Sequence, residues 1–308
     1  MVATVLNSPR AVEMSVYVVR AFVRLREMLA SNTALAQKLN ELERKLQSVV
    51  TQRASMDKFV DTVRARARGL IGTWVKIPTL ETVELLGHAG FEFVVIDMEH
   101  APHALDRVYE LIFAAQAVGM GALVRLPDHS GTTIQPLLDG GADGLLVPRV
   151  TGLDVATALT RKMVFGPKGE RGLGFTSRAG KWGLGSIPDY LARGDTQCVR
   201  MIQLEDWATL EATAGFAALE HVNGVFIGHG DLFLSSGKPP GSPEVQQLTA
   251  KMLKATKDAG VLSGVAAGSP AEAKAYLEMG FSLVMVSNDT TLFGRAAADA
   301  VKATLGSR

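Results

Sequence analysis

The sequence has very little cysteine. Cys198 is the only one among 308 residues, so an intrachain disulfide and a metal cluster built from several cysteines are both excluded. Free cysteine is usually buried, and Cys198 begins an apolar segment typical of a strand. We therefore expect a structural thiol rather than a catalytic one.

Long apolar runs are absent as well. No uncharged apolar segment approaches the roughly 18 residues that are needed to cross a bilayer. The first residues also lack the basic region and the long apolar region of a secretory signal peptide. These absences predict a cytoplasmic protein with no membrane partner.

Neither sign of charge dominates the chain, whose formal net charge is +1 at pH 7. The charges are nevertheless uneven, because residues 1–68 contain 12 Lys and Arg against 6 Asp and Glu, whereas the remainder contains 20 against 25. The basic excess thus belongs to the N-terminal segment alone. A nucleic-acid surface on the main part of the chain is not predicted.

Residues 1–55 show a helical pattern without a strand signal, and we expect them to form an α-helical extension. Apolar residues recur at spacings of three and four in residues 18–29 and 35–49, as in a helical hairpin or a short coiled coil. The words VLNSPRAVEM (5–14) and VRAFVRLREMLA (19–30) resemble the C-terminal end of phage KilA-N-type DNA-binding proteins. Three interpretations stay open: a fused remnant, an oligomerising appendage and a nucleic-acid element.

The pattern changes at residue 70, where short apolar segments begin to alternate with amphipathic ones. The expected strands are residues 70–77, 93–98, 122–126, 144–147, 199–204, 224–227, 262–266 and 283–287. The expected helices include residues 80–89, 105–118, 133–139, 206–219, 243–259 and 270–279. Near-continuous apolar strands that alternate with helices indicate a parallel sheet covered by helices. Eight such units in about 240 residues predict a closed (β/α)8 TIM barrel, which we assign to residues 56–308.

Chemically active side chains follow four of the expected strands: His100, Arg125, Glu205 and Asp231. The C-terminal ends of the strands of a parallel barrel meet on one face, so we expect these side chains to share a pocket.

Each of these residue types has more than one interpretation. Glu205 and Asp231 favour a hard divalent ion such as Mg2+ or Mn2+, but basic residues would also neutralise such a pair. A buried Arg125 needs an anionic partner, which is either a structural carboxylate or a substrate. His100 on a rim with carboxylates nearby suits a general base near neutral pH.

Taken together, several segments resemble the HpcH/HpaI aldolases. They are GTWVK (72–76), VIDMEHAP (95–102), VRLP (124–127), LLDGGADGLLVP (137–148), GERGLG (169–174), VFIG (225–228) and DTTLFGR (289–295). The resemblance extends over residues 57 to 305 and implies a TIM barrel of the pyruvate/phosphoenolpyruvate-utilising type. It further implies a metal-dependent aldolase, related to 2-dehydro-3-deoxyglucarate aldolase, that converts a 4-hydroxy-2-oxo acid into pyruvate and an aldehyde. It also implies a homo-oligomer, namely a hexamer.

The resemblance assigns catalytic roles to three residues. His100 would be the catalytic base, and Asp139 would be the carboxylate that orients it. Arg125 would contact the 2-oxo oxygen of the substrate and stabilise the enolate.

The remaining roles concern binding. Glu205 and Asp231 would hold Mg2+ or Mn2+, with Co2+ as a further candidate, and Gln203 would face the pyruvate. Backbone groups of Arg171 and Gly172 would help to seat its carboxylate.

The sequence departs from the family pattern in two places. In place of the usual glycine-proline-x-aspartate turn, this sequence has Gly228-His229-Gly230-Asp231, so that histidine stands where the family has proline. In place of the usual threonine or serine after the metal-binding glutamate, it has Asp206. His229 could then add a metal ligand or contact the aldehyde.

Other functions also stay open. Lys76 on the first strand is the candidate for a rival Schiff-base mechanism. The alternatives to an aldolase are a catalytically altered 2-oxo acid-binding protein and a decarboxylating or CoA-ester lyase that uses the same enolate chemistry.

Overall fold

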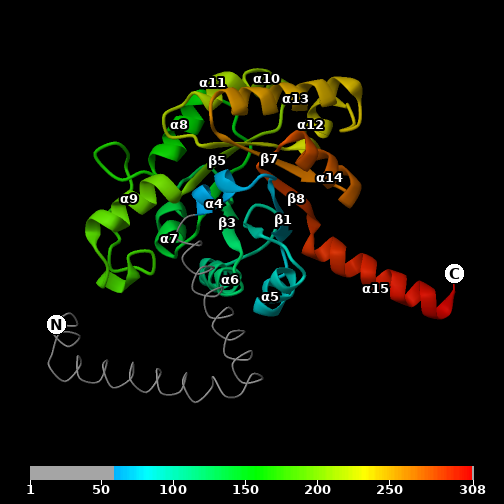
Figure 1. Cartoon of the computed structure of the whole chain (residues 1–308), viewed down its shortest axis with the longest axis horizontal. Helices are drawn as coiled ribbons and strands as arrows, with labels where there is room; N and C mark the ends of the chain where they lie inside the picture. Colours follow the sequence, from blue (N-terminus) through cyan, green and yellow to red (C-terminus); the bar gives the residue numbers. More distant parts are fainter. Residues whose placement is uncertain (1–58, 307–308) are drawn as a thin grey trace, which may run out of the picture. The chain divides into compact units, whose positions relative to one another are not determined.

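The computed structural model describes residues 59–306. The expected helical extension of residues 1–55, and with it the likeness to KilA-N-type proteins, lies outside these residues. The strands are β1 (Leu70–Val75), β2 (Phe93–Asp97), β3 (Gly121–Arg125), β4 (Gly144–Val147), β5 (Val199–Leu204), β6 (Gly224–Ile227), β7 (Leu262–Ala267) and β8 (Leu283–Asn288). They pair in parallel in the order β1 to β8 and close between β8 and β1, so the predicted TIM barrel is confirmed (Figure 1).

Helices follow the strands and surround the barrel. They are α4 (Phe59–Ala65), α5 (Leu80–His88), α6 (Leu105–Ala117), α7 (Ile134–Asp139), α8 (Leu153–Arg161), α9 (Ile187–Gln197), α10 (Trp207–Glu211), α11 (Thr213–Ala217), α12 (His229–Ser236), α13 (Pro243–Asp258), α14 (Pro270–Met279) and α15 (Asp289–Leu305). The single helix expected over residues 206–219 is wrong, because Ala212 leaves helical geometry with φ −86° and ψ 8° and separates α10 from α11.

Side chains alternate between two layers along every strand, as the two-residue period of a strand requires. One layer fills the barrel and includes Trp74, Phe93, Leu123, Met201 and Phe226. The other packs against the helices and includes their strand neighbours Val75, Val94, Val124, Ile202 and Ile227. Continuing the inward series by one step of two residues from Trp74, Leu123 and Met201, and by two steps from Phe93, brings Lys76, Arg125, Gln203 and Asp97 to the C-terminal mouth of the barrel.

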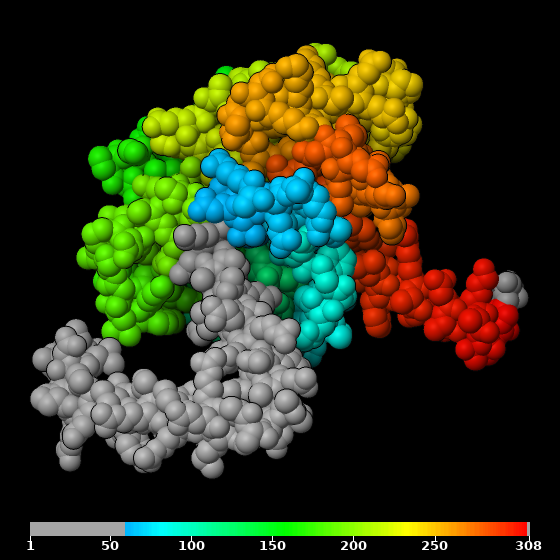
Figure 2. Space-filling view, viewed as in Figure 1, coloured from blue at the N-terminus to red at the C-terminus, as the bar shows by residue number. Residues whose placement is uncertain are grey.

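The opposite, N-terminal end of the barrel is closed by α4. Phe59, Val60 and Val63 are buried and belong to the same cluster as the inward side chains. Phe59 packs where β3 begins, since a Cβ atom at Gly121 would lie 2.1 Å from its ring. The blue residues from 59 onward occupy the middle of the face shown in Figure 2. Helix α4 therefore covers the N-terminal end of the barrel, and the polar inward side chains lie at the other end.

Two further observations bear on the predictions from sequence. Cys198 is buried as expected, and burial raises the pKa of its thiol. Among the described residues no helix is long and apolar enough to cross a membrane.

Candidate active site

A row of alternating charges crosses one side of the barrel mouth. Arg125 donates hydrogen bonds to both oxygens of Asp97, at 2.9 and 2.7 Å, and its third nitrogen lies 3.1 Å from Glu99. Lys76 extends the row beyond Asp97, with 3.4 Å from Nζ to Oδ2. Arg149 extends it beyond Glu99, with 3.0 Å from Nε to Oε1. The row begins and ends with a cation.

The centre of this row is buried and its ends are open. Asp97 is 0% exposed and the Arg125 side chain 6%, whereas the side chains of Lys76 and Arg149 are 27% and 60% exposed. Burial alone would raise the pKa of Asp97, but the hydrogen bond and charge of Arg125, the backbone N–H of His100 and the charge of Lys76 hold it below its usual value. Asp97 is therefore a carboxylate, and Arg125 is fixed by it.

Arg125 also makes a cation–π contact with Trp74. Its guanidinium carbon lies 4.1 Å from the centre of the Trp74 ring, and Trp74 in turn packs edge-on against Phe226 inside the barrel. A guanidinium held by a bidentate carboxylate and a ring face has little freedom to rotate. Its charge is thus preorganised at the mouth.

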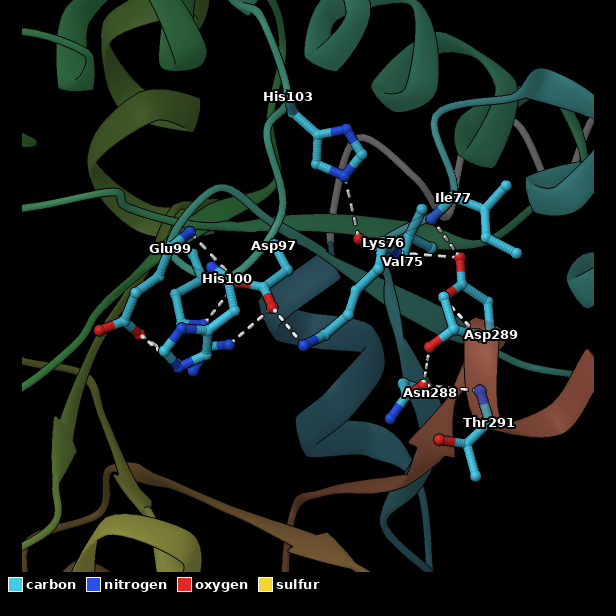
Figure 3. A network of polar contacts seen from close by, with 12 residues as sticks. Val75, Lys76, Ile77, Asp97, Glu99, His100, His103, Asn288, Asp289 and Thr291 are labelled. Atoms are coloured by element: carbon cyan, nitrogen blue, oxygen red, sulfur yellow. Dashed lines mark hydrogen bonds and ion pairs between the residues drawn. The ribbon is translucent and has the colours of Figure 1, made fainter. Parts of the chain in front are cut away.

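The loop after β2 carries His100 at the edge of this row (Figure 3). Its Nε2 lies 3.7 Å from Glu99, and its side chain is 52% exposed. The backbone N–H groups of Glu99 and His100 both donate to Asp97 at 3.2 Å, so the same buried carboxylate fixes Arg125 and the backbone of the loop.

The two acidic residues expected to bind metal meet on the other side of the mouth. Glu205 follows β5, and Asp231 lies in the first turn of α12 after β6. Burial, followed by the hydrogen bond and the charge of Asp231, raises the pKa of Glu205 to about 7. Two carboxyl groups that share a site in this way gain from a cation between them.

Neighbouring atoms also fit a cation or a polar ligand at this pair. The side-chain nitrogen of Gln203 donates to Glu205 at 2.8 Å, while its side-chain oxygen Oε1 is buried and has no hydrogen-bond partner among the described residues. The backbone N–H of Arg149 holds the other Glu205 oxygen at 2.6 Å. Within residues 59–306 no three His, Cys, Asp or Glu side chains gather as a metal site. The pair therefore suits an ion such as Mg2+, which keeps several waters.

Asp139 is hydrogen-bonded to three side chains other than His100. It accepts hydrogen bonds from Arg171 at 3.2 Å, Tyr190 at 3.3 Å and Gln135 at 2.6 Å. Among the hydrogen bonds and ion pairs of residues 59–306 none joins Asp139 to His100, whose nearest carboxylate is Glu99. That Asp139 orients His100 stays a prediction.

The backbone N–H groups expected to seat the substrate carboxylate already have partners. Arg171 N donates to Val164 O at 2.9 Å, and Gly172 N donates to the Gln135 side chain at 3.0 Å. Binding through these two groups stays a prediction, and it requires both hydrogen bonds to be exchanged.

His229 points away from the mouth into the layer of helices. It is hydrogen-bonded to Thr249 on α13 at 3.0 Å and stacked on Tyr276 of α14. Burial lowers the pKa of His229 and so favours the neutral ring. The structure thus gives His229 packing contacts with α13 and α14, in place of the considered contact with metal or aldehyde.

Sequence reasoning missed two members of the site, Arg149 and Trp74. Trp74 could have been found from the inward alternation along β1. Arg149 had no such signal, because it follows β4 in a left-handed conformation with φ 48°, and this turns its backbone N–H to Glu205 and its side chain to Glu99.

Comparison with known proteins agrees with this geometry. Residues 70–296 match the HpcH/HpaI aldolase/citrate lyase family. A 4-hydroxy-2-oxo-heptane-1,7-dioate aldolase of Escherichia coli is 34% identical over 244 residues, 78% of this chain and 92% of that protein. The enzyme of the same name from Salmonella dublin is 35% identical over 252 residues, 80% of this chain and 94% of that protein.

A solved structure shows the same barrel. A HpcH/HpaI aldolase/citrate lyase family protein from Burkholderia cenocepacia J2315 superimposes with a TM-score of 0.72 at 31% identity, covering 79% of this chain and 97% of that one. With the charged barrel mouth and the match over residues 70–296, this likeness establishes that the chain belongs to the HpcH/HpaI aldolase/citrate lyase family.

Proposed function

We propose that this protein is a metal-dependent aldolase that cleaves or forms a 4-hydroxy-2-oxo acid, with pyruvate and an aldehyde as the other reactants. The observation that carries the proposal is the pairing of Glu205 with Asp231 beside the unpartnered oxygen of Gln203. Divalent-metal dependence is typical of the family.

Glu205 and Asp231 are the residues that would hold the ion, and Mg2+, Mn2+ and Co2+ all suit oxygen ligands. A bound divalent cation supplies a Lewis acid that stabilises negative charge on the 2-oxo oxygen. Gln203 faces the same space and offers its free oxygen to a water or to the substrate.

Arg125 and His100 then divide the remaining chemistry. The imidazole of His100 accepts the 4-hydroxyl proton, the C3–C4 bond breaks, and its electron pair passes into the enolate of pyruvate as the aldehyde leaves. Arg125 contributes a fixed positive charge that meets the developing oxyanion, and preorganised charge of this kind is usually the largest catalytic contribution. Return of a proton to C3 completes pyruvate.

The test is a retro-aldol assay on the full chain. Racemic 4-hydroxy-2-oxoheptane-1,7-dioate and shorter 4-hydroxy-2-oxo acids are supplied with Mg2+, Mn2+ or Co2+, and pyruvate release is followed by lactate dehydrogenase. We expect release that stops with EDTA and returns when metal is restored. Binding of 2-oxo acids with no release from any substrate would favour a catalytically altered binding protein.

We also propose that the protein is a homo-oligomer located in the cytoplasm. Support for self-association comes from α15, whose apolar residues Leu292, Phe293, Val301 and Leu305 are all exposed in the single chain. Light scattering after gel filtration would give the number of subunits, and a monomer at micromolar concentration would refute association.

A further inference from the structure

Lys76 forms one end of the charged row, and the proposed aldol chemistry does not use its side chain. It follows Trp74 in the inward series of β1, and its side chain points toward Asp97 at the end of the neighbouring strand β2 (Figure 3). Within residues 59–306 its ammonium group makes this one ion pair at 3.4 Å and no hydrogen bond. Asp97 is already bonded to Arg125 through both of its oxygens. An ammonium has three donors, so Lys76 has donors left for a ligand.

The backbone around Lys76 is held firmly. The buried carboxylate of Asp289, at the start of α15, accepts hydrogen bonds from Lys76 N at 2.9 Å and Ile77 N at 2.8 Å. His103 adds a contact of 3.3 Å to the carbonyl of Val75 (Figure 3). The lysine therefore projects from a fixed strand end, as a binding group requires.

The position of β1 in the barrel shows which part of a substrate would reach it. In the closed order β1 to β8, β1 lies opposite β5, and Glu205 directly follows β5. The inward positions that connect the two sides through β6 to β8 carry small residues, namely Gly228, Ala266, Gly268 and Ser287. On the opposite side of the barrel, the inward positions at the ends of β2 and β3 are occupied by Asp97 and Arg125. An extended substrate that begins at Glu205 and runs along the side of β6 to β8 would pass only these small side chains at the inward positions before it reaches Lys76.

From this placement we infer that Lys76 is a specificity residue that selects aldehydes carrying a negative charge, a carboxylate or a phosphate, at the end distant from the carbonyl. This inference rests on the proposed aldolase function. A partly exposed ammonium that is free to donate recognises either anion by charge-assisted hydrogen bonds.

The experiment compares matched aldehydes in the aldol direction with pyruvate and Mg2+. Succinate semialdehyde is paired with butanal, and glyceraldehyde 3-phosphate with glyceraldehyde, so that each pair isolates the charge. The pair in which the charged aldehyde has the larger advantage in kcat/KM over its neutral partner shows whether the protein recognises a carboxylate or a phosphate. The variants are Lys76→Met, which removes the charge, Lys76→Arg, which keeps it, and Lys274→Met as a control at an exposed lysine of α14.

We expect the wild type to prefer the charged member of at least one pair. Lys76→Met should lower kcat/KM for that aldehyde by about tenfold, mainly through KM, and leave its neutral partner within about threefold. Lys76→Arg should keep most of the preference, and Lys274→Met should change nothing. Equal losses with charged and neutral aldehydes in Lys76→Met, or no preference in the wild type, would overturn the inference.

A separate measurement distinguishes this failure from failure of the proposed function. Exchange of the pyruvate methyl protons with deuterium needs no aldehyde, and we expect it in the wild type and equally in the surface control Lys274→Met. If the wild type exchanges the pyruvate protons but does not prefer charged aldehydes, the role of Lys76 is refuted and the proposed aldolase function is not. Covalent trapping of pyruvate on Lys76 by borohydride would refute both, because it would identify Lys76 as an imine-forming residue.

Discussion

Arg125 is the residue on which the buried charges of the mouth depend. It neutralises Asp97 and Glu99, whose side chains are 0% and 6% exposed. Replacement by alanine leaves these carboxylates without their central partner, so we expect the free energy of unfolding to fall by about 3 to 5 kcal/mol. Loss of the charge that meets the enolate should lower kcat by about 100- to 1000-fold. Urea unfolding and steady-state kinetics measure the two effects separately.

The matched control is Arg125→Lys, which keeps the charge but cannot bond both oxygens of Asp97. We expect it to recover part of the stability and less of the activity, because lysine is a point charge without the planar fork. Near wild-type turnover in Arg125→Ala would contradict the role given to this residue.

If Glu205 is a metal ligand as proposed, its raised pKa should make metal binding dependent on pH. Its pKa in the metal-free chain is raised from 4.5 to about 7, by burial first and by Asp231 next. Between these values the folded chain holds a proton that the unfolded chain has released, so the stability of the metal-free form falls as pH rises through this window. A metal ion must displace this proton. As the pH rises toward 7, the Kd for the metal ion should therefore fall by up to about tenfold per pH unit, and above pH 7 it should become constant.

Calorimetric titration with Mn2+ between pH 5.5 and 8.5 tests this dependence. Glu205→Gln should bind more weakly and lose most of the slope below pH 7. A wild-type Kd that does not change from pH 5.5 to 7 would contradict the assignment of Glu205 as a ligand.

At the scale of the element, the turn from β6 into α12 lies against the two carboxyl groups that we propose as metal ligands, Glu205 and Asp231. A Cβ atom at Gly228 would lie 2.7 Å from a Glu205 oxygen and 2.8 Å from the amide nitrogen of Gln203. Gly228→Ala should therefore push Glu205 aside and weaken Mn2+ binding by about tenfold or more. A Cβ atom at Gly230, two residues later, would have no such neighbour within 4 Å.

Gly230→Ala is thus a matched control in the same turn. We expect wild-type affinity for Mn2+ and an unchanged or slightly higher melting temperature, since alanine favours the helix. Equal losses of affinity in the two variants would show that the turn as a whole, rather than the space beside Glu205, governs the site.

The elements were more predictable than the contacts between them. The strand segments are recognisable as apolar runs ending in polar residues, and all eight are found close to their expected bounds. The break of the expected helix 206–219 at Ala212 had no signal, because alanine favours a helix. Likewise, the contacts of Asp139 depend on where the loop carrying Arg171 folds back, and no local pattern specifies that.

At the scale of the whole molecule, we expect residues at the N-terminal end of the barrel to affect folding stability and residues at the C-terminal mouth to affect catalysis. Phe59 closes the N-terminal end and is 5% exposed, while the mouth with Glu205 lies at the other. Phe59→Ala should cost about 3 to 5 kcal/mol of unfolding free energy. At temperatures where the variant stays folded, kcat and the Kd for Mn2+ should be unchanged. A large loss of activity in the folded variant would mean that the two ends are coupled.

The central claim is that the mouth of this barrel forms the pyruvate enolate with the help of a divalent metal. Exchange of the pyruvate methyl protons in deuterium oxide, followed by NMR with Mg2+ and then with EDTA, tests it without a choice of aldehyde. We predict exchange that stops on chelation, returns with Mg2+ and is lost in Glu205→Gln. Exchange that survives exhaustive removal of metal would contradict the account.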